Sequence, residues 1–155
     1  MPFLHVLVAE CVPSIMHTRI TVAAGVIRRE DGRVLVARRP RGKHMAGAWE
    51  FPGGKVRQGE TPRRTLDREL REELGISVRR STELMNYEQQ YPDRLVELHF
   101  FAVEDYDGSP GGREGQEICW EYPENLGALG FLPADRPLVE LLIQQTASLK
   151  GKSAR

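Results

Sequence analysis

A cluster of acidic side chains on one predicted helix constrains this chain more than any other feature. Like charges three and four residues apart lie on the same face of a helix, where they repel one another. A hard divalent cation is a natural compensator, because Mg²⁺ prefers oxygen ligands. An ordinary solvated helix with salt bridges also fits this stretch when it is taken alone. The side chains are Glu69, Glu72 and Glu73.

The helix that carries these glutamates has start and stop signals in the sequence. Thr61 is a residue type that caps helix N-termini, and Pro62 then takes the first helical position, where its missing N–H costs nothing. Leucines recur every four residues up to Leu74, which gives one apolar stripe. Gly75 is placed to end the helix in the left-handed conformation. We therefore predict a helix from residue 62 to about residue 74.

Segments rich in β-branched and aromatic residues predict strands on both sides of this helix. The Asp31-Gly32 pair favours a hairpin between the first two strands. A second helix is expected near the C-terminus, before a polar tail that should fray. This order of elements predicts a mixed α/β (α+β) fold class. We expect strands at residues 19–28, 33–38, 83–90, 95–105 and 116–121, and the second helix at 138–146.

The length of 155 residues indicates one domain with a hydrophobic core. We place that domain at residues 16–148, between an N-terminal extension (1–15) and a polar C-terminal tail (149–155). The extension is either an extra edge strand or a weakly ordered segment, and its apolar run is too short to span a membrane. We hypothesise that Met16 is an alternative start. A chain begun at Met16 that proved insoluble or inactive would contradict that hypothesis.

The charge balance argues against a broad surface for binding polyanions. Lys plus Arg and Asp plus Glu both number 22, so the net charge is zero and no nucleic-acid polymer is expected as a partner. Cys11 and Cys119 form no CxxC pair, so a zinc site is not expected and the cytoplasm is the default location. We expect a monomer or homodimer with no membrane partner.

Glycines ahead of the helix change the balance between the two interpretations of its glutamates. The Gly53-Gly54 turn can bring backbone groups beside the carboxylates, as a metal–phosphate site requires. Gly54, five residues, Glu60, seven residues and then Arg-Glu-Leu-Arg-Glu-Glu-Leu-Gly-Ile at 68–76 match every defined position of the Nudix box. The chain therefore resembles the Nudix hydrolase superfamily, and residues 19–145 resemble its MutT-like branch.

This resemblance implies a fold and a metal site. The Nudix fold is a mixed-sheet α/β/α sandwich in which the box forms a loop–helix–loop. The cofactor would be Mg²⁺, with Mn²⁺ as a possible substitute, and two further residues would hold the liganding carboxylates in place. The implied metal ligands are Gly53, Glu69, Glu72, Glu73 and Glu114, and the supporting residues are Glu60 and Arg68.

The resemblance also implies a reaction. A nucleoside triphosphate such as 8-oxo-dGTP would be hydrolysed to the monophosphate and pyrophosphate, which removes damaged nucleotides from the pool. A carboxylate would take the proton of the attacking water; we favour Glu69, with Glu73 as its competitor. The implied substrate contacts are Arg39, Phe51, Gly54, Lys55 and Asp135.

More than one nucleobase is compatible with the predicted substrate contacts. Phe51 fits a position in the hydrophobic core as well as a position in contact with the base. Arg39 and Lys55 fit solvated surface positions as well as positions that contact the substrate. MutT proper carries asparagine where this chain has Asp135, whereas related CTP pyrophosphohydrolases carry aspartate in this context. An ionised Asp135 only accepts hydrogen bonds, which suits an exocyclic amine such as that of cytosine or adenine.

Alternative functions follow from the same resemblance. One is a pyrophosphohydrolase of CTP or 5-substituted cytidine triphosphates, and another is a hydrolase of ADP-ribose or nucleotide sugars. A non-catalytic module that senses a nucleotide is a third. Such a module has no need to keep all three box carboxylates, and this chain keeps Glu69, Glu72 and Glu73. We therefore expect an enzyme.

Overall fold

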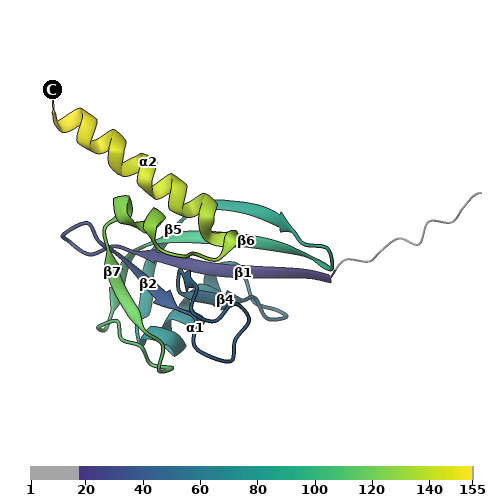
Figure 1. Cartoon of the computed structure of the whole chain (residues 1–155). Helices are drawn as coiled ribbons and strands as arrows, with labels where there is room; N and C mark the ends of the chain where they lie inside the picture. Colours follow the sequence, from purple (N-terminus) through teal and green to yellow (C-terminus); the bar gives the residue numbers. More distant parts are fainter. Residues whose placement is uncertain (1–17, 155) are drawn as a thin grey trace, which may run out of the picture.

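A computed structural model describes residues 18–154. Strands dominate the first part of the described chain and a long helix closes it (Figure 1). The elements are β1 (Thr18–Ile27), β2 (Val34–Arg38), β3 (Trp49–Glu50), β4 (Gly53–Lys55), α1 (Pro62–Leu74), β5 (Ser77–Gln90), β6 (Arg94–Asp107), β7 (Ile118–Glu121), the 3₁₀ helices η1 (Pro123–Ala128) and η2 (Pro133–Asp135), and α2 (Arg136–Ser153).

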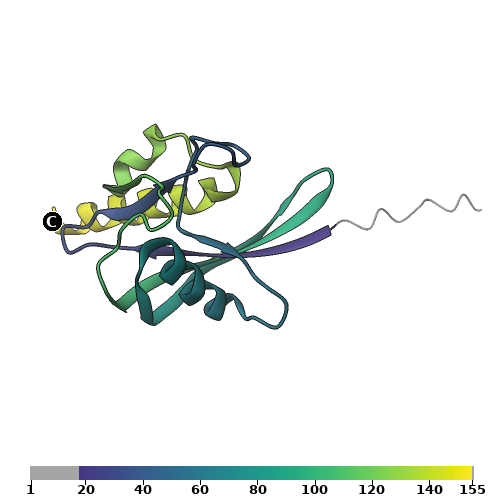
Figure 2. The ribbon, with the colours of Figure 1, turned by 90° about the horizontal axis from the view of Figure 1, so that it is seen from below.

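Two sheets form the centre of the molecule. The larger has the strand order β4-β1-β6-β5, and the smaller has the order β3-β2-β7. β1 and β6 run parallel, whereas β1 pairs with β4 and β5 pairs with β6 in the antiparallel sense. Figure 2 shows α1 lying across one side of the strands, with the β5–β6 hairpin extending past it. The mixed α+β class expected from the sequence is confirmed.

Alternation along β1 divides the core into two layers. Ala23 and Ile27 pack in the layer under α1, whereas Ala24 and Val26 pack in the layer under α2. Gly25 allows the close approach of α1, because a Cβ there would lie 3.0 Å from the Leu66 Cδ1 atom. Side chains of a strand point alternately to the two faces of a sheet, so one strand serves both layers.

The predicted limits of α1 are confirmed. Thr61 accepts a hydrogen bond of 3.3 Å from the Arg64 amide and so caps the helix. Gly75 ends the helix with φ of 73°, in the left-handed region that favours glycine. The stripe expected to face the core is fully buried, and it consists of Leu66, Leu70 and Leu74.

The strand expected at 83–90 begins earlier, at Ser77. Its first half is polar, and irregular pairing between residues 78 and 85 interrupts the simple alternation of a strand. Cross-strand ion pairs hold this half in place: Arg79 pairs with Asp105 at 2.7 Å, and Arg80 pairs with Glu104 at 2.9 Å. Hydrophobic periodicity carries no signal for pairing of this kind.

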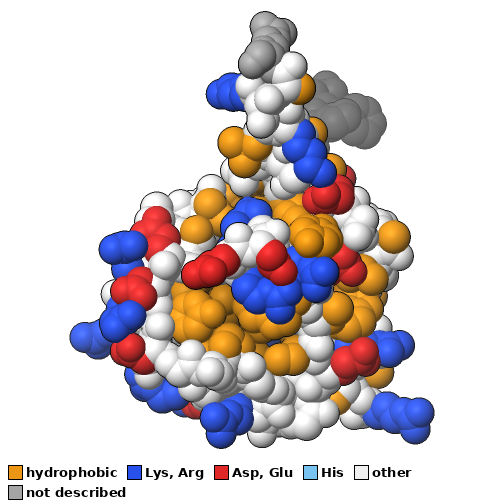
Figure 3. All heavy atoms as spheres, turned by 90° about the vertical axis from the view of Figure 1, so that its left-hand side faces the viewer, with side chains coloured by type: hydrophobic (Ala, Val, Ile, Leu, Met, Phe, Trp, Pro, Cys, Tyr) orange, Lys and Arg blue, Asp and Glu red, His pale blue; other side chains and the backbone are white. Residues whose placement is uncertain are grey.

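The closing helix is longer than the expected 138–146. α2 runs from Arg136 to Ser153, so residues expected in a frayed tail are helical. Figure 3 shows this end of the helix projecting from the body of the molecule. Leu149 is 69% exposed there, and Lys150 forms an ion pair with Glu124 of η1 at 2.6 Å. Basic residues in the last turn also favour the helix dipole.

Several expectations for the N-terminal part of the chain lie outside the described residues. They are the extension at 1–15, its apolar run, and the alternative start at Met16. Within residues 18–154, no helix is long and apolar enough to cross a membrane.

Candidate active site

Four carboxylates converge at the C-terminal end of α1. The backbone amide of Gly53 donates a hydrogen bond of 3.2 Å to Glu73 Oε2. Burial raises the pKa of Glu73 to about 8, and the nearby charges of Glu69, Glu50 and Glu114 add to that rise. Desolvation and like charges both disfavour an ionised carboxylate. Glu73 therefore lies where added positive charge would be most stabilising.

A single guanidinium holds the helix carboxylates together. Arg68 donates to Glu60 at 2.7 Å, to Glu69 at 2.6 Å and to Glu72 at 3.4 Å. Its remaining nitrogen donates to the Lys55 carbonyl at 3.1 Å, which ties β4 to the helix. These contacts raise the pKa of Arg68, so it stays charged. The box loop and the box helix thus share one cationic centre.

Glu60 supports Arg68 from the loop that precedes the helix. The hydrogen bond from Arg68 lowers the pKa of Glu60 to about 2, and a second bond from the Thr65 hydroxyl acts in the same direction. That hydroxyl lies 2.7 Å from Glu60 Oε2, and the Arg57 amide donates to the same oxygen at 3.1 Å. Glu60 is therefore ionised and fixed at neutral pH.

The glycine pair allows β4 to approach its neighbours closely. A Cβ on Gly53 would overlap the Ala23 carbonyl and the Ala24 backbone of β1. A Cβ on Gly54 would overlap the carboxylate of Glu69. The first glycine is therefore required by backbone packing, and the second by the position of a helix carboxylate.

The loop after β6 brings Glu114 to the same place. The amide of Gly111 donates to the Leu74 carbonyl at 3.0 Å, and the amide of Arg113 donates to the Glu73 carbonyl at 2.9 Å. The Gln116 side chain also donates to the Glu73 carbonyl, at 2.8 Å. These bonds satisfy carbonyls that the end of a helix leaves unpaired. The loop thereby packs against α1, and Glu114 lines a small pocket beside Glu73.

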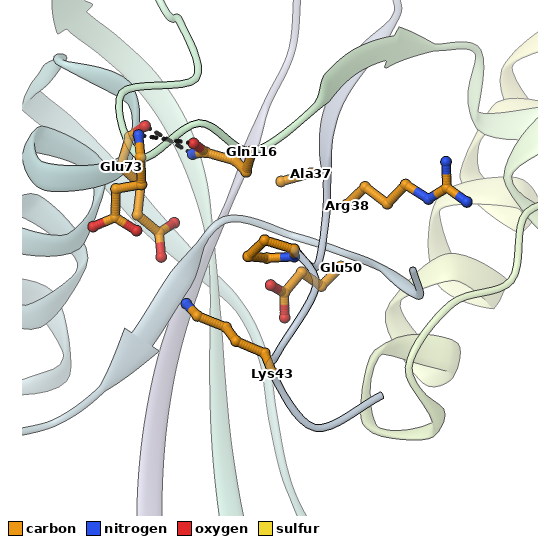
Figure 4. Close-up of a pocket in the computed structure, with 8 residues that line it drawn as sticks. Ala37, Arg38, Lys43, Glu50, Glu73 and Gln116 are labelled. Atoms are coloured by element: carbon orange, nitrogen blue, oxygen red, sulfur yellow. Dashed lines mark hydrogen bonds between the residues drawn. The ribbon is translucent and has the colours of Figure 1, made fainter. Parts of the chain in front are cut away.

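The small pocket contains both signs of charge. In Figure 4 the end of the Lys43 side chain points toward Glu73 across the pocket, and the carboxylate of Glu50 lies to one side of Lys43. Arg39 Nη1 lies 2.7 Å from Glu50 Oε2, and its Nε donates to the His44 carbonyl at 2.8 Å. Burial raises the pKa of Glu50, while Arg39 opposes that rise. The guanidinium of Arg39 is thus already engaged by protein groups.

A larger cleft of about 480 Å³ adjoins this pocket. Its apolar wall comes from β1 and β6, and its charged wall comes from β4 and α1. A cleft with one apolar side and a few placed polar groups suits a small-molecule ligand. The predicted site residues that line it are Arg39, Phe51, Gly53, Gly54, Lys55, Glu69, Glu73 and Asp135.

Asp135 forms the buried polar end of this cleft. It is 6% exposed, and its Oδ2 accepts a hydrogen bond of 2.9 Å from the Phe51 amide. Burial raises the pKa of Asp135 to about 7, although that bond opposes the rise. The Phe51 ring is 3% exposed and packs against Phe131 and Phe100 with centroids 5.4 and 6.3 Å away. Phe51 therefore belongs to the core and also lines the cleft.

The structure brings most of the predicted site residues together. Eight line the large cleft, Glu114 lines the adjoining pocket, and Glu60 and Arg68 brace the helix carboxylates. Glu72 points outward, with its side chain 45% exposed. Lys43 and Glu50 also line the site but were not predicted from the sequence. Glu50 is an acidic residue in an otherwise apolar strand end, and that was a usable signal.

The donor set at this site suits a hard divalent cation. Three carboxylates lie near Glu73, whose pKa is raised first by burial and then by the charges of Glu69, Glu50 and Glu114. Carboxylate oxygens are ligands that Mg²⁺ prefers. Within residues 18–154, no three acidic, histidine or cysteine side chains are already arranged to hold an ion. The Arg68 guanidinium forms ion pairs with Glu69 at 2.6 Å and with Glu72 at 3.4 Å, so both carboxylates already have a cationic partner. The chemistry of the donors fits such a cation, and side-chain rotation would be needed to bind it.

Comparison with known proteins identifies the family. The NUDIX domain family matches residues 18–142. The chain belongs to the Nudix family. This Nudix protein is 40% identical over 124 residues to the 8-oxo-dGTP diphosphatase of Escherichia coli (strain K12), covering 80% of this chain and 96% of that protein. It is 39% identical over 129 residues to the CTP pyrophosphohydrolase of the same organism, covering 83% of this chain and 95% of that protein.

Solved structures of Nudix proteins share its fold. A structure from work on MutT of Aliivibrio salmonicida and Vibrio cholerae matches with a TM-score of 0.73 and 36% sequence identity. The match covers 83% of this chain and 99% of that chain. The expected Nudix fold and the resemblance to MutT are therefore confirmed.

Proposed function

We propose that this Nudix hydrolase is a Mg²⁺-dependent pyrophosphohydrolase of modified nucleoside triphosphates such as 8-oxo-dGTP. The products would be the nucleoside monophosphate and pyrophosphate, and the role would be sanitation of the nucleotide pool. One observation carries the proposal: a cleft bounded by Glu69 and Glu73 extends to the buried Asp135. A nucleotide bound in this cleft would thus place its phosphates near Glu69 and Glu73 and its base near Asp135. Relatives named 8-oxo-dGTP diphosphatase support this choice.

The metal would be held by the oxygen donors gathered around the end of α1. Bound Mg²⁺ would neutralise phosphate charge and lower the pKa of a coordinated water, and Mn²⁺ could substitute. Arg68 must release part of its hold on Glu69 and Glu72 for these carboxylates to become ligands. Glu60 would keep Arg68 in place during that change. The proposed ligands are Glu69, Glu72, Glu73, Glu114 and the Gly53 carbonyl.

A carboxylate would accept the proton of the attacking water. We keep Glu69 as the proposed base and Glu73 as its competitor. Glu69 lines the cleft and packs directly against Gly54, so its carboxylate is fixed relative to the loop. Lys55 also lines the cleft and is exposed, which leaves its ammonium group available for a phosphate.

The end of the cleft at Asp135 would read the base. Phe51 closes that end of the apolar wall, and Arg39 borders it. A neutral Asp135 both donates and accepts hydrogen bonds, whereas the ionised form only accepts. The carboxylate favours a second candidate function, hydrolysis of CTP-type substrates, which is the activity named for a 39% identical relative.

A substrate panel tests the proposal. The protein is incubated with Mg²⁺ and 8-oxo-dGTP, dGTP, CTP, a 5-substituted cytidine triphosphate, ATP or ADP-ribose, and pyrophosphate is measured against orthophosphate. We expect pyrophosphate release with a preference for 8-oxo-dGTP. A preference for the cytidine nucleotides would support the second candidate, and turnover of ADP-ribose alone would contradict both. Binding without any turnover would identify a non-catalytic module.

A further inference from the structure

One side chain next to the cleft has a hydrogen-bonding group that the protein leaves unused. The hydroxyl of Tyr87 is buried and has no hydrogen-bond partner among residues 18–154. Buried hydroxyls are normally paired, and one left without a partner destabilises the folded state. Such a group calls for an explanation from its surroundings.

Tyr87 borders the wall of the cleft from β5. It pairs in register with Leu98 of β6, and its ring stacks on Phe100 with centroids 5.9 Å apart. Both of these residues line the cleft that ends at Asp135. Burial raises the pKa of the Tyr87 hydroxyl, and the charges of Asp135 and Tyr91 add to that rise. Phe100 also packs against the Phe51 ring, and the Phe51 amide donates to Asp135, so the Tyr87 side chain belongs to the aromatic cluster beside the Asp135 end of the cleft.

Asp135 has capacity to accept another hydrogen bond. Its Oδ2 is bonded to the Phe51 amide, while Oδ1 accepts no hydrogen bond from the described residues. Two charged groups also act on Asp135: Glu50 favours its neutral form and Arg39 favours its ionised form. A hydroxyl donor bonded to the carboxylate would favour the ionised, accepting form.

We propose that Tyr87 is a positioning residue for Asp135, donating its hydroxyl to the carboxylate when a nucleobase occupies the cleft. This inference rests on the proposed function, because it assumes that a base reaches Asp135. A base that donates to Asp135 draws the carboxylate into its ionised form, which is the better acceptor for the hydroxyl. The hydrogen bond left unmade in the free protein is then made in the complex, and it contributes to affinity.

Removal of the hydroxyl gives an unusual pair of expectations. Tyr87→Phe should leave the melting temperature unchanged or raise it, because the free protein loses only an unpaired group. The same variant should raise KM roughly 10-fold with kcat within about twofold, the loss expected for one hydrogen bond to a charged group. Tyr122→Phe, on a tyrosine that does not line the cleft, is the matched control and should change neither. A lower melting temperature with unchanged KM would overturn the proposal, because the hydroxyl would then be structural.

A double-mutant cycle tests whether Tyr87 acts through Asp135. Binding of 8-oxo-dGMP and CMP is measured by calorimetry for wild type, Tyr87→Phe, Asp135→Ala and the double variant. We expect Tyr87→Phe to weaken binding in the wild-type background and to have no further effect in the Asp135→Ala background. Additive losses would overturn the proposal.

The same measurements separate this inference from the proposed function. A wild-type protein that binds the monophosphates but releases no pyrophosphate from any triphosphate contradicts the proposed function, while the cycle still tests Tyr87. Turnover of triphosphates with an additive cycle contradicts the role of Tyr87 alone. A wild-type protein that binds neither monophosphate contradicts the role of Tyr87, and the turnover panel then decides the proposed function by itself.

Discussion

The amide of Gly53 donates a hydrogen bond of 3.2 Å to the carboxylate of Glu73, which lies in the last turn of α1. This contact joins the glycine loop to the helix at the point where four carboxylates converge. The box is therefore one structural unit, in which the loop sets the position of the helix side chains.

The two glycines of the loop should respond differently to an added methyl group. Gly53→Ala should lower the free energy of unfolding by about 1–3 kcal/mol, because the new Cβ overlaps backbone atoms of β1. Gly54→Ala should leave the fold nearly intact but lower kcat/KM by about 100-fold, because the new Cβ displaces the Glu69 carboxylate. Thermal melts and pyrophosphate release measure the two effects. Equal losses of stability in both variants would refute this division.

Replacing Arg68 should impair activity although Arg68 is not proposed to contact the substrate or the metal. Arg68→Ala removes the cation that holds Glu60, Glu69 and Glu72, so kcat/KM should fall by about 10- to 100-fold. The variant should also depend on a higher Mg²⁺ concentration, because its carboxylates are no longer positioned. Arg64→Ala, on an exposed residue of the same helix, is the control. An Arg68→Ala enzyme with normal activity and normal Mg²⁺ dependence would exclude the bracing role.

Asp135 should make stability depend on pH. Burial raises its pKa from an ordinary value of 3.8 to about 7 in the folded protein, so the folded state binds the proton more tightly than the unfolded state does. The stability that this proton contributes is complete below pH 3.8 and is lost as the pH rises through 7. Asp135→Asn cannot lose a proton, so its melting temperature should rise relative to wild type between pH 4 and pH 8. A difference that is constant over this range would contradict the expectation.

The same substitution should alter substrate choice. Asp135→Asn supplies a permanent amide donor beside the Phe51 amide, as asparagine does in MutT proper. We expect the ratio of kcat/KM for 8-oxo-dGTP to that for CTP to increase by roughly 10-fold, the effect of about one hydrogen bond. Competition assays with the two triphosphates measure this ratio. An unchanged ranking would show that Asp135 does not read the base.

Much of the fold was predictable because local signals agreed with tertiary packing. Both ends of α1 were predicted correctly, because Thr61, Pro62 and Gly75 specify them without the help of tertiary contacts. The polar start of β5 was not found, because it depends on ion pairs with a strand that follows later in the sequence. The extent of α2 was also underestimated, since its last turns bury little apolar surface and lack a periodic stripe.

The candidate site was predictable to the degree that its residues share one motif. The box glutamates follow a fixed spacing, so the sequence alone places them on one helix face. Lys43, Glu50 and Tyr87 come from separate strands and loops, and only the fold brings them to the cleft. The unpaired hydroxyl of Tyr87 has no counterpart in the sequence, because burial and missing partners are tertiary properties.

Glu73→Gln is the most direct test of the central claim that these carboxylates bind the catalytic metal. The change keeps size and hydrogen bonding but removes the negative charge. We expect Mg²⁺-dependent kcat to fall by at least about 1,000-fold, as for removal of a central catalytic group, while the melting temperature stays the same or rises because repulsion is relieved. Glu140→Gln, on exposed α2, controls for loss of an acidic residue. Near-normal turnover by Glu73→Gln would contradict the metal site.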